Sequence, residues 1–70
     1  MNGREFIVRV RKLARRNGMA VRFDRTRGKG SHGTLYYGDR FTVMKDRRKP
    51  LKAGTLRGMC RQLGIDPNDL

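Results

Sequence analysis

The first apolar pattern along the chain has the period of an α-helix. Positions spaced i, i+4, i+7 and i+8 are apolar, as in a helix with one buried face: Phe6, Val10, Leu13 and Ala14. Asn2 and Glu5 have the spacing of a capping box, with Asn in the place of Ser or Thr. Gly18 suits the end of the helix because glycine adopts the left-handed conformation easily. The pattern predicts a helix over residues 3–17.

A second helical stripe lies near the end of the chain. Its apolar positions follow the spacing i, i+3, i+4 and i+7: Leu56, Met59, Cys60 and Leu63. This stripe predicts a helix over residues 53–63, with Gly64 as its C-terminal cap. Asp66 and Pro67 then suit the N-cap and the first position of one more short turn.

The segment between the two helices alternates between apolar and polar residues. Val21 and Phe23 fall on one side of a strand over residues 20–24. Residues 32–37 and 41–45 predict two further strands, joined by a hairpin at Gly38 and Asp39.

The register of this hairpin decides which side chains reach the core. A two-residue turn would place Leu35 opposite Thr42, which mixes apolar and polar residues on one face. A three-residue loop over residues 38–40 instead gathers four apolar side chains on one face, and we prefer it: Leu35, Tyr37, Phe41 and Val43. Strand alternation then sends three residues to the open face: His32, Thr34 and Tyr36.

Together these elements predict an α+β fold in the order αβββα, formed by a single domain over residues 1–70. A three-stranded antiparallel sheet with both helices on one face buries every apolar stripe. A chain of 70 residues has only a thin core. We therefore expect any active site to be shallow and open, which suits a polymeric substrate.

The charge of the chain points to a polyanionic partner. It has 18 Lys and Arg against 6 Asp and Glu, a formal net charge of +12. Repulsion among so many cations destabilises the compact state, and a partner such as nucleic acid, an anionic membrane or an acidic protein relieves it. No apolar run is long enough to span a membrane, and no secretory signal is present. Cys60 is the only cysteine and suits the core, so we expect no internal disulfide and a reducing, cytoplasmic location.

His32 is the only histidine and the strongest candidate for catalysis. Histidine exchanges protons at physiological pH, and a general base near an RNA 2′-hydroxyl, with cations around the phosphate, can cleave the strand without a metal. Glycines around His32 let backbone approach a ligand, and cations precede it: Arg25, Arg27 and Lys29. No metal-binding cluster and no cofactor motif is present. An RNA-contacting or merely exposed histidine is the competing interpretation.

Further residues are candidates for RNA contacts. Tyr36 on the open face could stack on a base, although strand propensity alone would also explain it. Four cations precede the second helix, where they could meet phosphates together with its free N–H groups: Arg47, Arg48, Lys49 and Lys52. A solvated loop is the alternative for each of them.

The stretch Gly30-Ser31-His32, followed by a strand, resembles the G-S-H motif of HicA-type toxins, and the run Gly54-Thr55-Leu56-Arg57 is similar to part of that family's closing helix. The resemblance covers essentially the whole chain. It implies a fold like that of double-stranded-RNA-binding domains, cleavage of mRNA with His32 as the catalytic residue, and a hetero-oligomer with a HicB-type antitoxin that covers the active site. Many relatives carry a second histidine where this chain has Gly33, and the loop from Arg25 to Lys29 is more basic than is usual in the family.

The leading hypothesis is therefore a metal-independent endoribonuclease toxin. One histidine cannot be general acid and general base at once, so water, Ser31, Tyr36 or a lysine must assist. A non-catalytic RNA-binding module, such as a ribosome-associated protein, would share the charge and the fold. A basic face that only binds a protein is the third hypothesis.

Overall fold

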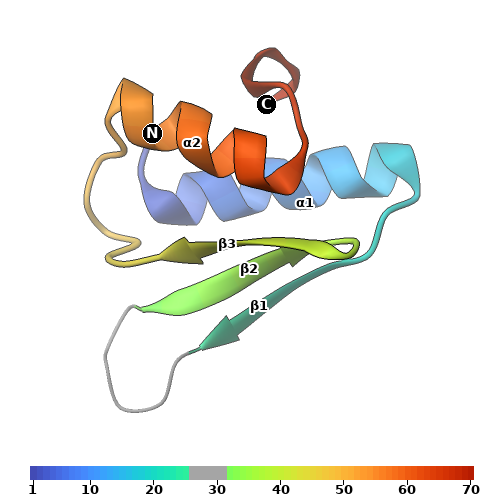
Figure 1. The fold of residues 1–70 in the computed structure, drawn as a ribbon, viewed down its shortest axis with the longest axis horizontal. Helices are drawn as coiled ribbons and strands as arrows, with labels where there is room; N and C mark the ends of the chain where they lie inside the picture. Colours follow the sequence, from blue (N-terminus) through green and yellow to red (C-terminus); the bar gives the residue numbers. More distant parts are fainter. Residues whose placement is uncertain (26–31) are drawn as a thin grey trace.

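The computed structural model describes residues 1–25 and 32–70, and in them it contains two helices packed on a three-stranded sheet (Figure 1). The elements follow in this order: α1 (Gly3–Asn17), β1 (Val21–Arg25), β2 (Gly33–Tyr37), β3 (Arg40–Met44), α2 (Ala53–Leu63) and a short 3-10 helix, η1 (Pro67–Asp69). The predicted α+β class and the order αβββα are confirmed, as are the bounds of both helices. No helix among these residues is long and apolar enough to cross a bilayer.

Local capping explains why α1 begins and ends where it does. The Asn2 side chain accepts a hydrogen bond from the backbone N–H of Glu5 at 2.9 Å, and the Glu5 carboxylate accepts one from the N–H of Asn2 at 3.4 Å. Gly18 ends the helix in the left-handed conformation, with φ of 67°. Both caps agree with the sequence prediction.

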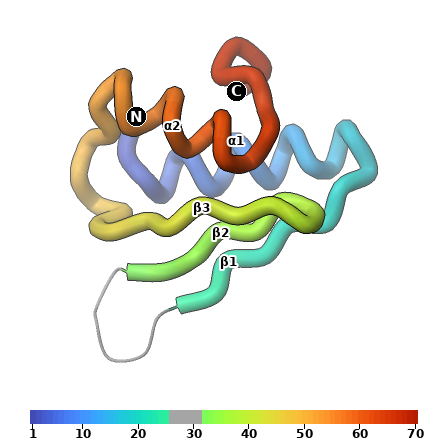
Figure 2. Tube along the Cα trace, in the orientation of Figure 1, coloured from blue at the N-terminus to red at the C-terminus, as the bar shows by residue number. Residues whose placement is uncertain are grey.

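The sheet is antiparallel in the order β1-β2-β3, and both helices cover the same face of it. Figure 2 shows the same two layers as a tube. Among the described residues, no element covers the other side of the sheet, which we call the open face. Val21 and Phe23 of β1 pack against the core, as predicted.

The predicted hairpin register is wrong by one residue. β2 and β3 are joined by a two-residue turn that pairs Tyr37 with Arg40 and Leu35 with Thr42. Phe41 and Val43 therefore lie on the open face, 55% and 60% exposed. Gly38 has φ of 61°, and no other residue of the turn has a positive φ, as in a type II′ turn, which matches the twist of a hairpin.

Contacts with α2 explain why the polar Thr42 replaces Phe41 and Val43 in the core. Thr42 is only 1% exposed, and its hydroxyl donates a hydrogen bond to the side-chain carbonyl of Gln62. On the same side of β3, the Arg40 guanidinium donates to the carbonyls of Gln62, at 2.8 Å, and Arg61, at 3.0 Å. A buried polar group costs little once it is paired, and a cation at a helix C-terminus is favourable.

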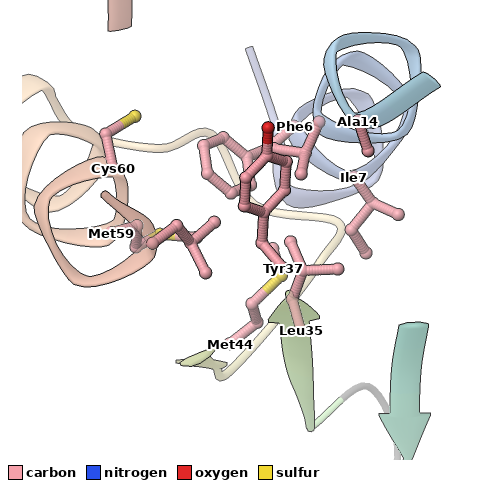
Figure 3. Close-up of a cluster of buried hydrophobic side chains, with 10 residues drawn as sticks. Phe6, Ile7, Ala14, Leu35, Tyr37, Met44, Met59 and Cys60 are labelled. Carbon is pink, nitrogen blue, oxygen red and sulfur yellow. The ribbon is translucent and has the colours of Figure 1, made fainter. Parts of the chain in front are cut away.

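The core lies between the sheet and the two helices (Figure 3). Its fully buried apolar side chains come from both helices and from the middle strand: Phe6, Val10, Leu35, Cys60 and Leu63. Tyr37 is 6% exposed, and its hydroxyl accepts a hydrogen bond from the Asn17 side chain at 3.0 Å. The expectation that Tyr37 belongs to the core is confirmed.

Candidate nucleic-acid interface

His32 immediately precedes β2 and is exposed to solvent. Gly33, the next residue, faces the core side, where a Cβ would collide with the ring of Phe23. Because strand side chains alternate between faces, His32 lies on the open face with Thr34 and Tyr36. The imidazole is thus available to a polymer that lies along the sheet.

Lys45 lies one residue beyond the last pair of the β2–β3 ladder, as His32 does on the other strand. The last pair is Gly33 with Met44, so a ladder continued by one step would bring His32 and Lys45 across from each other. Lys45 is exposed and lies outside the apolar core. The sequence analysis missed this lysine because the register that it preferred would have paired Lys45 with Gly33, on the helix-covered side.

Arg25 is adjacent to His32 in the sheet but belongs to the other face. It pairs with Gly33 and follows the alternation of Val21 and Phe23, which point toward the helices. On that face, the positive charge of Arg25 is one of the causes that lower the pKa of Arg47. The predicted proximity of Arg25 to His32 holds along the backbone, while the two side chains leave the sheet in opposite directions.

Arg47 has a structural role in addition to its charge. Its guanidinium lies 4.7 Å from the centre of the Phe23 ring, and its carbonyl accepts a hydrogen bond from the N–H of Arg4 at 3.1 Å. Partial burial, together with the positive charges of Arg25 and Arg4, lowers the pKa of the Arg47 guanidinium from its ordinary value. Three guanidinium groups that repel one another at one end of the sheet favour the binding of an anion there.

The other predicted cations lie in the connection between β3 and α2, which Figure 1 shows at the same end of the sheet as the start of β2. Arg48 pairs with Asp46, and the backbone N–H of Arg48, at 3.0 Å from the carboxylate, is the main reason why the pKa of Asp46 is lowered. Lys49 is exposed. Lys52 is the N-cap residue of α2 and makes no side-chain capping bond. These cations extend the positive end of the molecule without touching His32 in the described contacts.

Tyr36 lies on the open face, as predicted, and has two partners that the sequence analysis did not single out. The Arg22 guanidinium lies 4.5 Å from the centre of the Tyr36 ring. The Phe41 ring centre lies 6.0 Å from that of Tyr36, with the two planes tilted by 46°. The signal that identifies both partners is the strand pairing: β1 with β2 pairs Arg22 with Tyr36, and the β2–β3 hairpin pairs Tyr36 with Phe41.

Three predicted site residues, Arg27, Lys29 and Ser31, lie outside the described residues. Within residues 1–25 and 32–70, no group of three or more His, Cys, Asp or Glu side chains could hold a metal ion. The described open face carries one imidazole, His32, and one carboxylate, Asp24, which pairs with Thr34.

Comparisons of the chain with models of protein families, with curated proteins and with solved structures find no match. The resemblance of Gly30-Ser31-His32 to the HicA motif therefore stays a prediction.

Proposed function

We propose that this chain is a metal-independent endoribonuclease of the HicA type, which acts as a toxin by cutting mRNA. The observation that carries the proposal is the position of His32, exposed immediately before β2, in a chain of net charge +12. An exposed imidazole in a chain that attracts polyanions, with Lys45 one residue beyond the last pair of the ladder, supplies groups that cleavage of RNA needs.

The reaction uses the nucleophile that RNA itself carries. His32 accepts the proton of a 2′-hydroxyl as that oxygen attacks the neighbouring phosphorus. The bond from phosphorus to the 5′-oxygen breaks, and the leaving oxygen takes up a proton from water or from a second acid. The products are a 2′,3′-cyclic phosphate and a 5′-hydroxyl end, and Lys45 supports the proposal because an ammonium group there can stabilise the phosphorane.

The proposal includes a partner that neutralises the toxin by covering the same surface. A HicB-type antitoxin that covers His32 would need acidic or hydrogen-bonding groups opposite Lys45 and the cations of the β3–α2 connection. Association of such oppositely charged surfaces is fast and is slowed by salt. We place the pair in the cytoplasm, where mRNA is the available substrate.

The test is cleavage of a labelled mRNA by the wild type and by His32→Ala, in buffer with a chelator of divalent metals. Loss of a general acid or base slows such a reaction by about 10²- to 10⁴-fold. Arg11→Ala, which removes one exposed charge from α1, is the matched control and should cut normally. His32→Ala should still bind RNA and should no longer arrest growth when expressed from an inducible promoter. Cleavage at the wild-type rate by His32→Ala refutes the mechanism, and binding without any cleavage by the wild type favours the non-catalytic RNA-binding module.

A further inference from the structure

Two large apolar residues of β3 are exposed although the domain has few such residues for its core. Phe41 is 55% exposed and Val43 is 60% exposed. They lie close together on the open face, where the register pairs Phe41 with Tyr36 and Val43 with Thr34. Contiguous exposed apolar groups on a small domain indicate a binding surface.

One row across this face consists entirely of planar groups. The pairing of β1 with β2 and of β2 with β3 aligns Arg22, Tyr36 and Phe41, which we call the planar row. The Arg22 guanidinium lies 4.5 Å from the Tyr36 ring centre, and the Tyr36 and Phe41 ring centres are 6.0 Å apart. The Arg22 guanidinium lies over the Tyr36 ring, so the groups that the row presents for stacking are this Arg22–Tyr36 pair and the tilted Phe41 ring next to it.

We propose that the planar row is a stacking platform for unpaired RNA bases next to the phosphate on which His32 acts. The inference rests on the proposed ribonuclease function and specifies its substrate as RNA that is single-stranded at the site. Aromatic rings and arginine planes are the groups on which proteins stack splayed bases. Bases within a duplex already stack on their neighbours and do not present their faces.

The distances within the sheet suit this arrangement. Tyr36 follows His32 by four residues on the same face, which is about 13 Å along a strand. A chain that places its phosphate at His32 and Lys45 therefore runs along β2 before its bases reach the planar row. Between them lie Thr34 and Val43, which the register pairs and which present a half-buried hydroxyl-bearing side chain and an exposed apolar one.

The charge of the open face favours RNA over an apolar protein surface as the occupant. Its described strand positions carry one cation, Arg22, and one acidic residue, Asp24, and the cation Lys45 follows directly after β3, in a chain of net charge +12. A platform that combines aromatic rings with cations attracts the phosphates of a nucleic acid and stacks its bases at the same time. Binding of a protein partner on this face instead of RNA is one of the results that the experiment below can give.

The test measures binding of an uncleavable probe, a short RNA with 2′-O-methyl groups, by fluorescence anisotropy. The probe is used both single-stranded and annealed to its complement. Phe41→Ala and Phe41→Leu should each weaken single-strand binding by about 5- to 150-fold, the range for loss of one stacked base, and leave duplex binding unchanged. Val8→Ala, which shortens an apolar side chain that is 50% exposed on α1, is the matched control and should bind both probes normally.

A spectroscopic measurement checks the stacking itself. The chain has no tryptophan and two tyrosines, so Tyr37→Phe leaves Tyr36 as the only tyrosine. Its fluorescence should be quenched when the single-stranded probe is added, and much less so with the duplex. Circular dichroism confirms that each variant is folded.

Several outcomes would overturn the platform. The platform is refuted if both Phe41 variants bind the single-stranded probe with the affinity of the wild type. It is also refuted if Phe41→Leu alone does so, because leucine keeps an apolar contact but cannot stack. Unchanged RNA binding with loss of an acidic protein partner would assign the face to that protein instead. Because the probe cannot be cut, these results stand whether or not His32 proves catalytic, and cleavage by the Phe41 variants tests the ribonuclease separately.

Discussion

The hairpin register is open to a direct test with two neighbouring residues of β3. Thr42→Lys and Val43→Lys introduce the same side chain and the same charge one position apart. In the observed register Thr42 is 1% exposed and Val43 is 60% exposed. The shifted register expected from the hydrophobic pattern would reverse these environments.

The sizes of the two effects follow from the contacts. Lysine at position 42 loses the hydrogen bond to Gln62, places an ammonium group in the core, and brings it near the Arg40 guanidinium on the same face. An unpaired buried charge costs several kcal/mol, which is comparable with the total stability of about 3.5 to 10 kcal/mol for a chain of this length. Lysine at position 43 points into solvent, so its cost is below about 1 kcal/mol and comes from strand propensity.

The assay is urea unfolding followed by circular dichroism, with thermal melting as a second measure. Val43→Lys should melt close to the wild type. Thr42→Lys should lose about 3 kcal/mol or more, which lowers the melting temperature of a domain of this size by about 12 °C or more. Equal stability of the two variants, or a lower stability of Val43→Lys, would refute the register and with it the placement of Phe41 on the open face.

Two further predictions concern the packing of the core. A Cβ at Gly33 would collide with the ring of Phe23, so Gly33→Ala should lower the free energy of unfolding by about 1 to 3 kcal/mol. A Cβ at Gly54, in α2, would contact no other atom, so Gly54→Ala should raise the free energy of unfolding by about 0.4 to 1 kcal/mol. Burial, followed by the charge of Asp66, raises the pKa of the Cys60 thiol. The stabilisation that this raised pKa reflects is therefore complete below about pH 8.5 and is lost as the pH rises further. The wild type should lose more stability than Cys60→Ala between neutral and alkaline pH. If the thiol of the native protein reacted with a thiol reagent as fast as the thiol of the unfolded chain, the burial of Cys60 would be contradicted.

The helices could be predicted from the sequence because their signals are local. The capping box of Asn2 and Glu5 and the left-handed glycines at positions 18 and 64 act within a few residues of each helix end. The apolar stripe of α1 has the helical period, and its residues are the ones that the structure buries. Asp66 and Pro67 likewise begin the short helix η1, as predicted.

The register could not be predicted because it depends on partners far along the chain. Counting apolar residues favours Phe41 and Val43 over Thr42 for the core. The burial of Thr42 becomes acceptable only through Gln62, which lies 20 residues away on α2. The exposure of His32 was predictable from strand alternation. The two neighbours of Tyr36, Arg22 and Phe41, follow from the strand pairing and were missed, as was Lys45.

The position of Lys45 explains why the observed register prevails and links stability to the proposed chemistry. Burying Phe41 and Val43 would gain about 3 to 6 kcal/mol. The same shift would expose Met44, which loses about 1.5 to 3 kcal/mol. It would also break one hydrogen bond of Thr42 and two of Arg40, about 1 kcal/mol each. The gain and the losses therefore nearly cancel. The shifted register would also pair Lys45 with Gly33 and turn its ammonium group toward the helix-covered side, which is unfavourable. The pairing that keeps Lys45 out of the core is therefore also the pairing that leaves Phe41 beside Tyr36 on the open face.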